Sequence, residues 1–254
     1  MKKNLYFRNT VQRKNVLREF FLSIFSMFSG YPRLMIEVFI RKDFGERYFK
    51  ISSAITAFVI FAAAPFLLQW FEDAGEEETR RSHVAGNQML YIYLGLFILF
   101  SIKRYLETRH NPSVFDTEKY SLYGGTIHPG FKRIKIFGTK PSIRLIETVL
   151  EPLPFFVAGV ILWMLNQSLG ILLVASSIFY SLSYVALYDQ GDNYVMDMLD
   201  QMIMNEMLED AFVNDQDPSK TKGVRTMGRK PADEDIRREV LKGMLDEEEV
   251  YTVT

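Results

Sequence analysis

Few residues in this sequence have the types and spacing that catalysis or metal binding requires. Its three histidines are His83, His110 and His128, and no two of them stand at the spacing of paired metal ligands. His110 precedes an Asn-Pro pair and His128 a Pro-Gly pair, both of which are typical of turns. Cysteine is absent, so disulfides, thiolate metal sites and cysteine nucleophiles are excluded. We therefore expect no metal, no cofactor and no catalytic residue.

One set of acid–base candidates supports a less favoured hypothesis. Asp116 and Glu118 lie between His110 and His128 and could pair with either of them, as an enzyme acting on membrane lipid would require. The Gly-Gly pair at residues 124–125 lacks the lysine and the helix of a phosphate-binding loop. The sequence also has no Gly-x-Ser-x-Gly motif.

Glu151 is the most interesting single residue, because it opens an apolar stretch and is followed by two prolines. A carboxylate at this place could be an ion or proton site within the membrane. It could also lie at headgroup depth, where the positive end of a helix favours an anion. The second interpretation is preferred.

Four long apolar stretches must position these residues. They cover residues 51–71, 84–102, 149–165 and 169–188 and are almost free of charge. A helix rises ~1.5 Å per residue, so about 20 such residues cross the ~30 Å hydrocarbon core of a bilayer. Only three polar residues separate the last two stretches, which predicts a tight hairpin, and Pro65 should kink the first. The predicted fold is mostly α, a polytopic membrane protein with four transmembrane helices in two hairpins.

The first 50 residues are basic and amphipathic. Apolar side chains recur at helical spacing over residues 16–28, Gly30-Tyr31-Pro32 predicts a break, and a second helix is expected over 34–49. These helices either lie on the anionic inner leaflet or form a hairpin on the protein's own cytoplasmic face. We expect no cleavable signal peptide, because serine interrupts the first apolar run and Gly30 and Pro32 follow it.

The distribution of basic residues predicts the topology. Residues 1–50 hold 11 Lys and Arg and residues 103–148 hold nine, whereas residues 72–88 hold two. By the positive-inside rule the N-terminus, the middle region and the C-terminus are cytoplasmic, in a bacterial inner membrane. Within the middle region, residues 119–123 and 131–137 have strand-like composition on either side of turn residues, which predicts a small β-hairpin.

The tail from residue 189 is acidic, with 17 Asp and Glu against eight Lys and Arg. Residues 189–213 predict a Met-rich helix, residues 214–231 a flexible linker and residues 232–254 a docking helix with a short end. Two apolar stripes are candidate partner-binding surfaces; their residues are Met196, Leu199, Ile203 and Met207 in the first helix and Ile236, Val240, Leu241, Met244 and Leu245 in the second. For the first stripe, binding to another protein subunit and self-association as a homo-oligomer both stay open. For the second, another protein is preferred.

The expected organisation has seven parts: a basic region (1–50), a transmembrane hairpin (51–102), a cytoplasmic middle domain (103–148), a second hairpin (149–188), a helix (189–213), a linker (214–231) and a docking tail (232–254). The favoured function is a non-catalytic inner-membrane subunit that anchors or scaffolds a multiprotein complex, such as a conjugation or secretion machine. The alternative is an oligomeric pore-forming or membrane-perturbing effector. Nucleic acid is not an expected partner, because basic residues beside a membrane usually contact anionic lipid.

Overall fold

The structure is a computed structural model that describes residues 3–12, 16–72, 87–110, 120–135 and 138–246. The chain forms two compact units. Unit 1 combines Met1–Glu19 with Asp189–Thr254, and unit 2 is Phe20–Tyr188. Two long helices, α1 (Val16–Ile40) and α9 (Ser168–Phe212), each contribute residues to both units.

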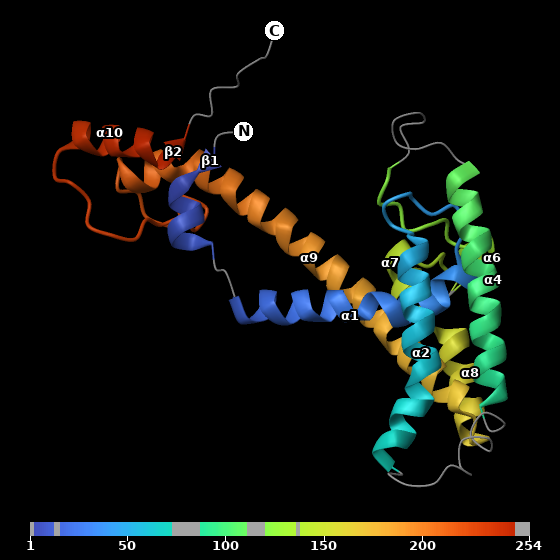
Figure 1. The fold of residues 1–254 in the computed structure, drawn as a ribbon. Helices are drawn as coiled ribbons and strands as arrows, with labels where there is room; N and C mark the ends of the chain where they lie inside the picture. The colour runs from blue at the N-terminus through green and yellow to red at the C-terminus, as the bar shows by residue number, and fades with distance from the viewer. Residues whose placement is uncertain (1–2, 13–15, 73–86, 111–119, 136–137, 247–254) are drawn as a thin grey trace. The chain divides into compact units, whose positions relative to one another are not determined.

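Unit 2 is helical, as the sequence predicts. Besides its parts of α1 and α9 it contains α2 (Ile51–Glu72), α4 (Gln88–His110), α6 (Pro129–Arg133), α7 (Ile143–Leu145), a π-helical turn η2 (Ile146–Leu150) and α8 (Leu153–Met164) (Figure 1). Its main hydrophobic core gathers side chains from α1, α2, α4 and α9 around Met35, Ala54, Leu94 and Leu173.

Among the described residues, three helical segments are long and apolar enough to cross a membrane. They are Gln88–His110, Ile143–Met164 and the 45-residue helix Ser168–Phe212. The prediction of four such helices is therefore confirmed for three only. The remaining stretch lies in α2, a 22-residue helix whose apolar part with described side chains is Ile51–Phe66.

The tight hairpin predicted around residues 166–168 is present between α8 and α9. Asn166 adopts the left-handed conformation that the turn needs, with φ of 56°. Two glycines let the helices approach each other closely. A Cβ atom added at Gly170 would lie 2.3 Å from the backbone nitrogen of Trp163 and 2.7 Å from the carbonyl oxygen of Gly159. Only glycine fits this contact without moving a backbone.

The predicted break at Gly30-Tyr31-Pro32 is wrong, because α1 runs through it as one helix with Pro32 inside. Proline removes one helical hydrogen bond and strains the preceding turn. Burial offsets that cost, since Met35 and Ile36 just beyond the proline are both 0 % exposed. The second helix expected over 34–49 ends at Ile40, and a loop follows it.

The β-hairpin predicted in the middle region is absent from its described residues. Pro129–Arg133 forms the short helix α6 instead. The extended stretch before it pairs with the loop after α1: Gly45 donates its N–H to the carbonyl of Tyr123 at 2.8 Å, and Thr126 donates to Lys42 at 2.7 Å. Composition predicted extended backbone here but not its partner, which lies about 80 residues away in the chain.

Unit 1 brings the two ends of the described chain together. Strand β1 (Lys3–Asn4) pairs antiparallel with β2 (Leu245–Asp246), and a π-helical turn η1 (Phe7–Val11) follows β1. Asp233 caps the start of helix α10 (Glu234–Met244), its side chain accepting from the N–H of Asp235. The core of the unit contains Phe7, Met204 and Leu208, with α10 residues packed against it.

The segment predicted as a linker, residues 214–231, forms turns that contact the end of α9. Lys230 donates from Nζ to the carbonyl of Ala211 at 2.5 Å and forms an ion pair with Asp215. Arg237 donates to the carbonyl of Val213 and pairs with Asp215 at 2.8 Å. The Lys230 hydrogen bond lowers the pKa of Asp215, with further lowering by the two positive charges.

Candidate functional site

A buried group of charged and phenolic side chains lies where α1 meets α9 and the segment before α8. We call it the Arg–Glu–Tyr cluster; its members are Arg33, Glu37, Arg41, Tyr48, Glu147, Glu151, Tyr180, Tyr184 and Tyr188. Most of them fall into three series with a spacing of four residues, one in each of three segments. Residues four apart share one helical face, so each segment presents its polar groups on a single side.

Arg41 is the centre of the cluster. It directly follows α1, where the negative end of the helix favours a cation. Its Nε lies 3.1 and 3.2 Å from the two carboxylate oxygens of Glu151, and Nη2 donates to Glu151 and to Glu147 at 3.1 Å. Nη1 donates to the phenol oxygen of Tyr184 at 2.6 Å and to the carbonyl of Gly124 at 3.2 Å. All five N–H groups of the guanidinium therefore have acceptors.

The tyrosine hydroxyls donate hydrogen bonds to the three carboxylates. Tyr180 donates to Glu151 at 2.5 Å, and Tyr188 donates to Glu147 at 2.5 Å. Glu37 accepts from Tyr184 at 3.0 Å and from Tyr48 at 2.8 Å.

Arg33 completes the cluster beside Glu37. Its Nε lies 3.3 Å from a carboxylate oxygen of Glu37, and its Nη2 donates to the Tyr48 hydroxyl at 2.9 Å. Burial, and next the charge of Glu37, raise the pKa of Tyr48, so its phenol remains protonated.

Burial makes this arrangement energetically demanding. Glu151 is 0 % exposed, Glu37 1 % and Arg41 2 %. A charge in such a place is tolerated only when it is paired and its hydrogen-bonding capacity is filled. Each of the three carboxylates forms an ion pair with an arginine and accepts a hydrogen bond from at least one tyrosine. The ion pairs and hydrogen bonds of the cluster fix the end of α1 to the segment that precedes α8 and to α9.

A glycine loop closes over Arg41. Gly124 supplies the carbonyl acceptor, and Gly125 has a φ of 87°, which favours glycine. A Cβ atom at Gly125 would lie 2.9 Å from the ring of Phe44 and 3.1 Å from the Cβ atom of Arg41. The Gly-Gly pair therefore allows backbone to approach the cluster.

The acid–base candidates do not converge in the described part of the chain. His128 caps α6, its Nδ1 accepting from the N–H of Gly130 at 3.2 Å, which agrees with a turn role. His110 is the last residue of α4. His83, Asp116 and Glu118 lie outside the described residues. The described residues also contain no group of three or more acidic or histidine side chains that could hold a metal ion.

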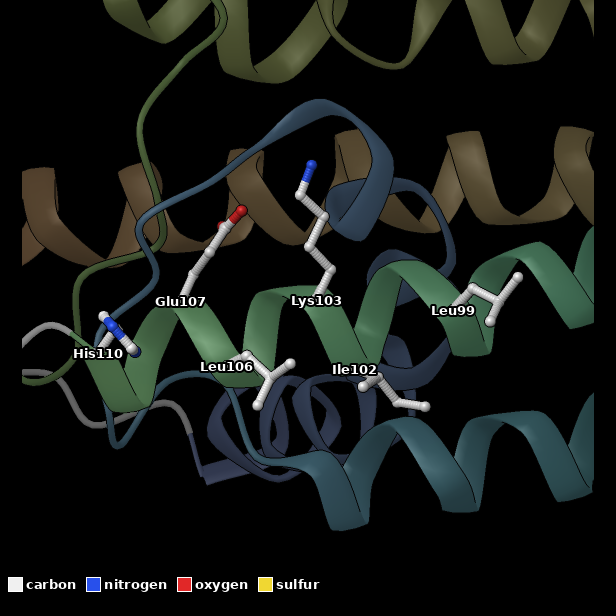
Figure 2. A pocket seen from close by; sticks show the side chains of 6 residues that line it. All are labelled: Leu99, Ile102, Lys103, Leu106, Glu107 and His110. Atoms are coloured by element: carbon white, nitrogen blue, oxygen red, sulfur yellow. The ribbon is translucent and has the colours of Figure 1, made fainter.

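A shallow depression of about 500 Å³ lies beside α4 and includes His110. Its lining is Leu99, Ile102, Lys103, Leu106, Glu107 and His110, all from this one helix. Figure 2 shows Lys103 and Glu107 pointing away from Ile102 and Leu106. Glu107 is already paired with Arg104 at 2.7 Å. These side chains do not converge on one point, so the depression offers no catalytic geometry.

The candidate partner-binding residues have different environments. Met196 and Leu199 are about half exposed, and Ile203 and Met207 are partly buried. The stripe of this helix that is fully buried instead contains Met204 and Leu208, one position further along the chain. One residue rotates a helix by about 100°, so this buried stripe is a neighbour of the candidate partner-binding stripe and a separate surface.

The candidate residues in and just after α10 also differ in their burial. Leu241, Met244 and Leu245 pack against the core of unit 1, whereas Ile236 is 50 % and Val240 39 % exposed. The sequence offered no internal packing site for this helix, because Phe7 near the other end of the chain provides part of it.

Sequence reasoning singled out Glu151 but not its partners. The pattern that could have found them is the spacing of four shared by Arg33, Glu37 and Arg41 and by the tyrosines of α9. Charged and phenolic residues repeated on one face beside an apolar bundle indicate a buried polar contact. The pairing of the two segments depends on the tertiary structure.

The chain matches no protein-family model, no curated protein and no solved structure. The fold therefore defines its class: a mostly helical protein whose described residues include three helical segments long and apolar enough to cross a membrane.

Proposed function

We propose that this chain is a non-catalytic integral membrane subunit that binds a cytoplasmic protein partner through the acidic part of α9. The observation that carries the proposal is an apolar stripe on that part of the helix. Tyr194, Val195, Leu199 and Met202 are all between 51 and 67 % exposed. Large apolar side chains on one exposed face commonly mark a binding surface.

Charge indicates the kind of partner. Residues 189–212 contain seven Asp and Glu and no Lys or Arg. Two copies of this stretch side by side would place like charges together, which opposes self-association. A basic amphipathic helix would cover the stripe and neutralise its flanks. The partner is therefore a different protein with a basic helical segment.

The location of the partner follows from topology. The pairing of β1 with β2 in unit 1 supports a topology in which both ends of the described chain lie on the same side of a membrane. An even number of crossings is then required, and three segments qualify by length and composition. The 22-residue apolar helix α2 is assigned as the fourth. The excess of basic residues in 1–50 and 103–148 supports the proposal that this side is the cytoplasmic face of a bacterial inner membrane.

A crosslinking experiment with matched variants tests the proposal. A photoreactive amino acid at Tyr194 or Leu199 should crosslink a distinct protein in native membranes, and the same reagent at Ile236 should not. Leu199→Asp with Met202→Asp should remove that protein from the purified complex. Ile236→Asp with Val240→Asp, at exposed positions on α10, should retain it.

The comparison of variants gives a clear decision. A crosslink to a second copy of the chain would replace the scaffold with self-association. Retention of the full set of partners by the α9 variant would refute the proposed surface. Leu241→Asp with Met244→Asp is unsuitable for this test, because those side chains pack in the core of unit 1 and their loss would also unfold it.

A further inference from the structure

The two parts of α1 within unit 2 have opposite environments. From Ser29 onward the helix is mostly buried, and Met35, Ile36 and Val38 are 0 % exposed. Before Ser29 the helix is mostly exposed. Five large apolar side chains there are between 40 and 70 % exposed; they are Phe20, Phe21, Ile24, Met27 and Phe28.

These five side chains share one face of the helix. Their positions follow the spacing of one, four, seven and eight residues that defines a helical stripe. The neighbouring face packs on α9, where the rings of Phe25 and Phe179 stack with centroids 5.9 Å apart. Ser26 is exposed on the side of the helix opposite the apolar stripe, and Ser23 is exposed at the edge of the stripe. The exposed part of α1 is thus amphipathic, with one side resting on a membrane-crossing helix.

The buried part of α1 holds the helix crosswise to the bundle. Figure 1 shows α1 running across α2 and α4 rather than along them. Arg104 of α4 donates to the carbonyl of Val38 at 3.1 Å, and Tyr93 donates to the carbonyl of Met35 at 2.8 Å. Beyond the helix, Arg41 is fixed by the Arg–Glu–Tyr cluster. A helix crosswise to helices that cross a membrane lies along the membrane plane.

We propose that the apolar stripe of α1 is a membrane-binding surface that inserts at the boundary between the headgroups and the acyl chains. A helix lying in this plane buries its apolar face ~5–10 Å into that boundary. The stripe is also continuous with apolar surface on the crossing helix, because the exposed residues Ile178 and Leu182 of α9 lie within one turn of Phe179. The same bilayer that surrounds α9 covers the stripe.

Single cysteines provide the test, because the chain contains none of its own. Phe21→Cys, Ile24→Cys and Met27→Cys report the stripe, and Ser26→Cys reports the polar side. Each full-length variant is spin-labelled in nanodiscs of phosphatidylcholine and phosphatidylglycerol in equal parts. The stripe positions should be more accessible to oxygen, which concentrates in lipid, than to a water-soluble nickel chelate. Position 26 should show the reverse order.

Depth gives a second measurement on the same variants. A fluorophore at Ile24→Cys should be quenched more by lipids with a nitroxide near the headgroup than by lipids with one near the acyl-chain end. Ile178→Cys serves as a lipid-facing control and Met202→Cys as a water-facing control. High chelate accessibility at residues 21, 24 and 27 would refute the proposal. So would exclusion of both reagents, which would mean that a second copy or another protein covers the stripe.

Discussion

Arg41 and Glu151 form a buried ion pair across 110 residues of sequence. The pair joins the end of α1 to the start of the apolar α8 segment, and both side chains are almost completely inaccessible. Ion pairs of this kind gain little over an apolar contact, but the loss of one partner leaves an uncompensated charge. The pair therefore specifies how α1 attaches to the crossing segments more than it adds stability.

That asymmetry gives a first prediction. Arg41→Ala should cost about 3–5 kcal/mol of unfolding free energy, because it leaves Glu147 and Glu151 without their cation. Arg238→Ala, which breaks an exposed pair with Glu234, should cost ~0–1 kcal/mol. Thermal unfolding of the detergent-solubilised protein measures both. Equal effects of the two substitutions would show that Arg41 is not buried among carboxylates.

A second prediction concerns the glycine contact in the α8–α9 hairpin. Gly170→Ala places a methyl group against the backbone at Trp163, so overpacking should destabilise the protein by about 1–3 kcal/mol. Gly191→Ala in the same helix has open space around it and should stabilise it by about 0.5–1 kcal/mol. Unfolding curves of the two variants should shift in opposite directions. A stabilising Gly170→Ala would contradict the close approach of α8 and α9.

A third prediction concerns pH and unit 1. The pKa of Asp215 lies below its ordinary value of 3.8, chiefly because Lys230 donates a hydrogen bond to it. A carboxyl with a lowered pKa stabilises the folded state above the unfolded-state pKa, and this contribution is lost as the pH falls through the folded-state value. Amide exchange of residues 214–237 should therefore accelerate as the medium becomes strongly acidic. In Asp215→Asn this part of the pH dependence should disappear, and an unchanged profile would argue against the ion pairs.

A fourth prediction tests orientation. With single cysteines in intact cells, a membrane-impermeant thiol reagent should label Gln167→Cys, in the short turn between α8 and α9. It should label Tyr120→Cys, which is 66 % exposed, only after the cells are permeabilised. The reason is the excess of Lys and Arg around residue 120 and their absence from the turn. The opposite labelling pattern would invert the topology and move the acidic part of α9 out of the cytoplasm.

The sequence alone was sufficient where a property depends on neighbouring residues. Charge-free stretches of about 20 residues predict helices that can cross a membrane, and the three polar residues 166–168 predict the hairpin. The absence of cysteine and the acidic tail are also direct properties of the sequence. The helical periodicity of residues 189–213 predicted one helix there, but it did not identify Met204 and Leu208 as the residues buried in unit 1.

Only the tertiary structure decided the properties that depend on distant residues. Pro32 lies inside a helix because the residues after it are buried against α4 and α9, which a local rule cannot include. Phe7 provides part of the packing site of α10 although more than 200 residues separate them. Glu151 was visible as a carboxylate at an apolar boundary, yet its partner Arg41 became identifiable only when α1 was placed across the bundle. Long-range contacts of this kind arise from shape and burial, and local sequence patterns do not encode which segments will meet.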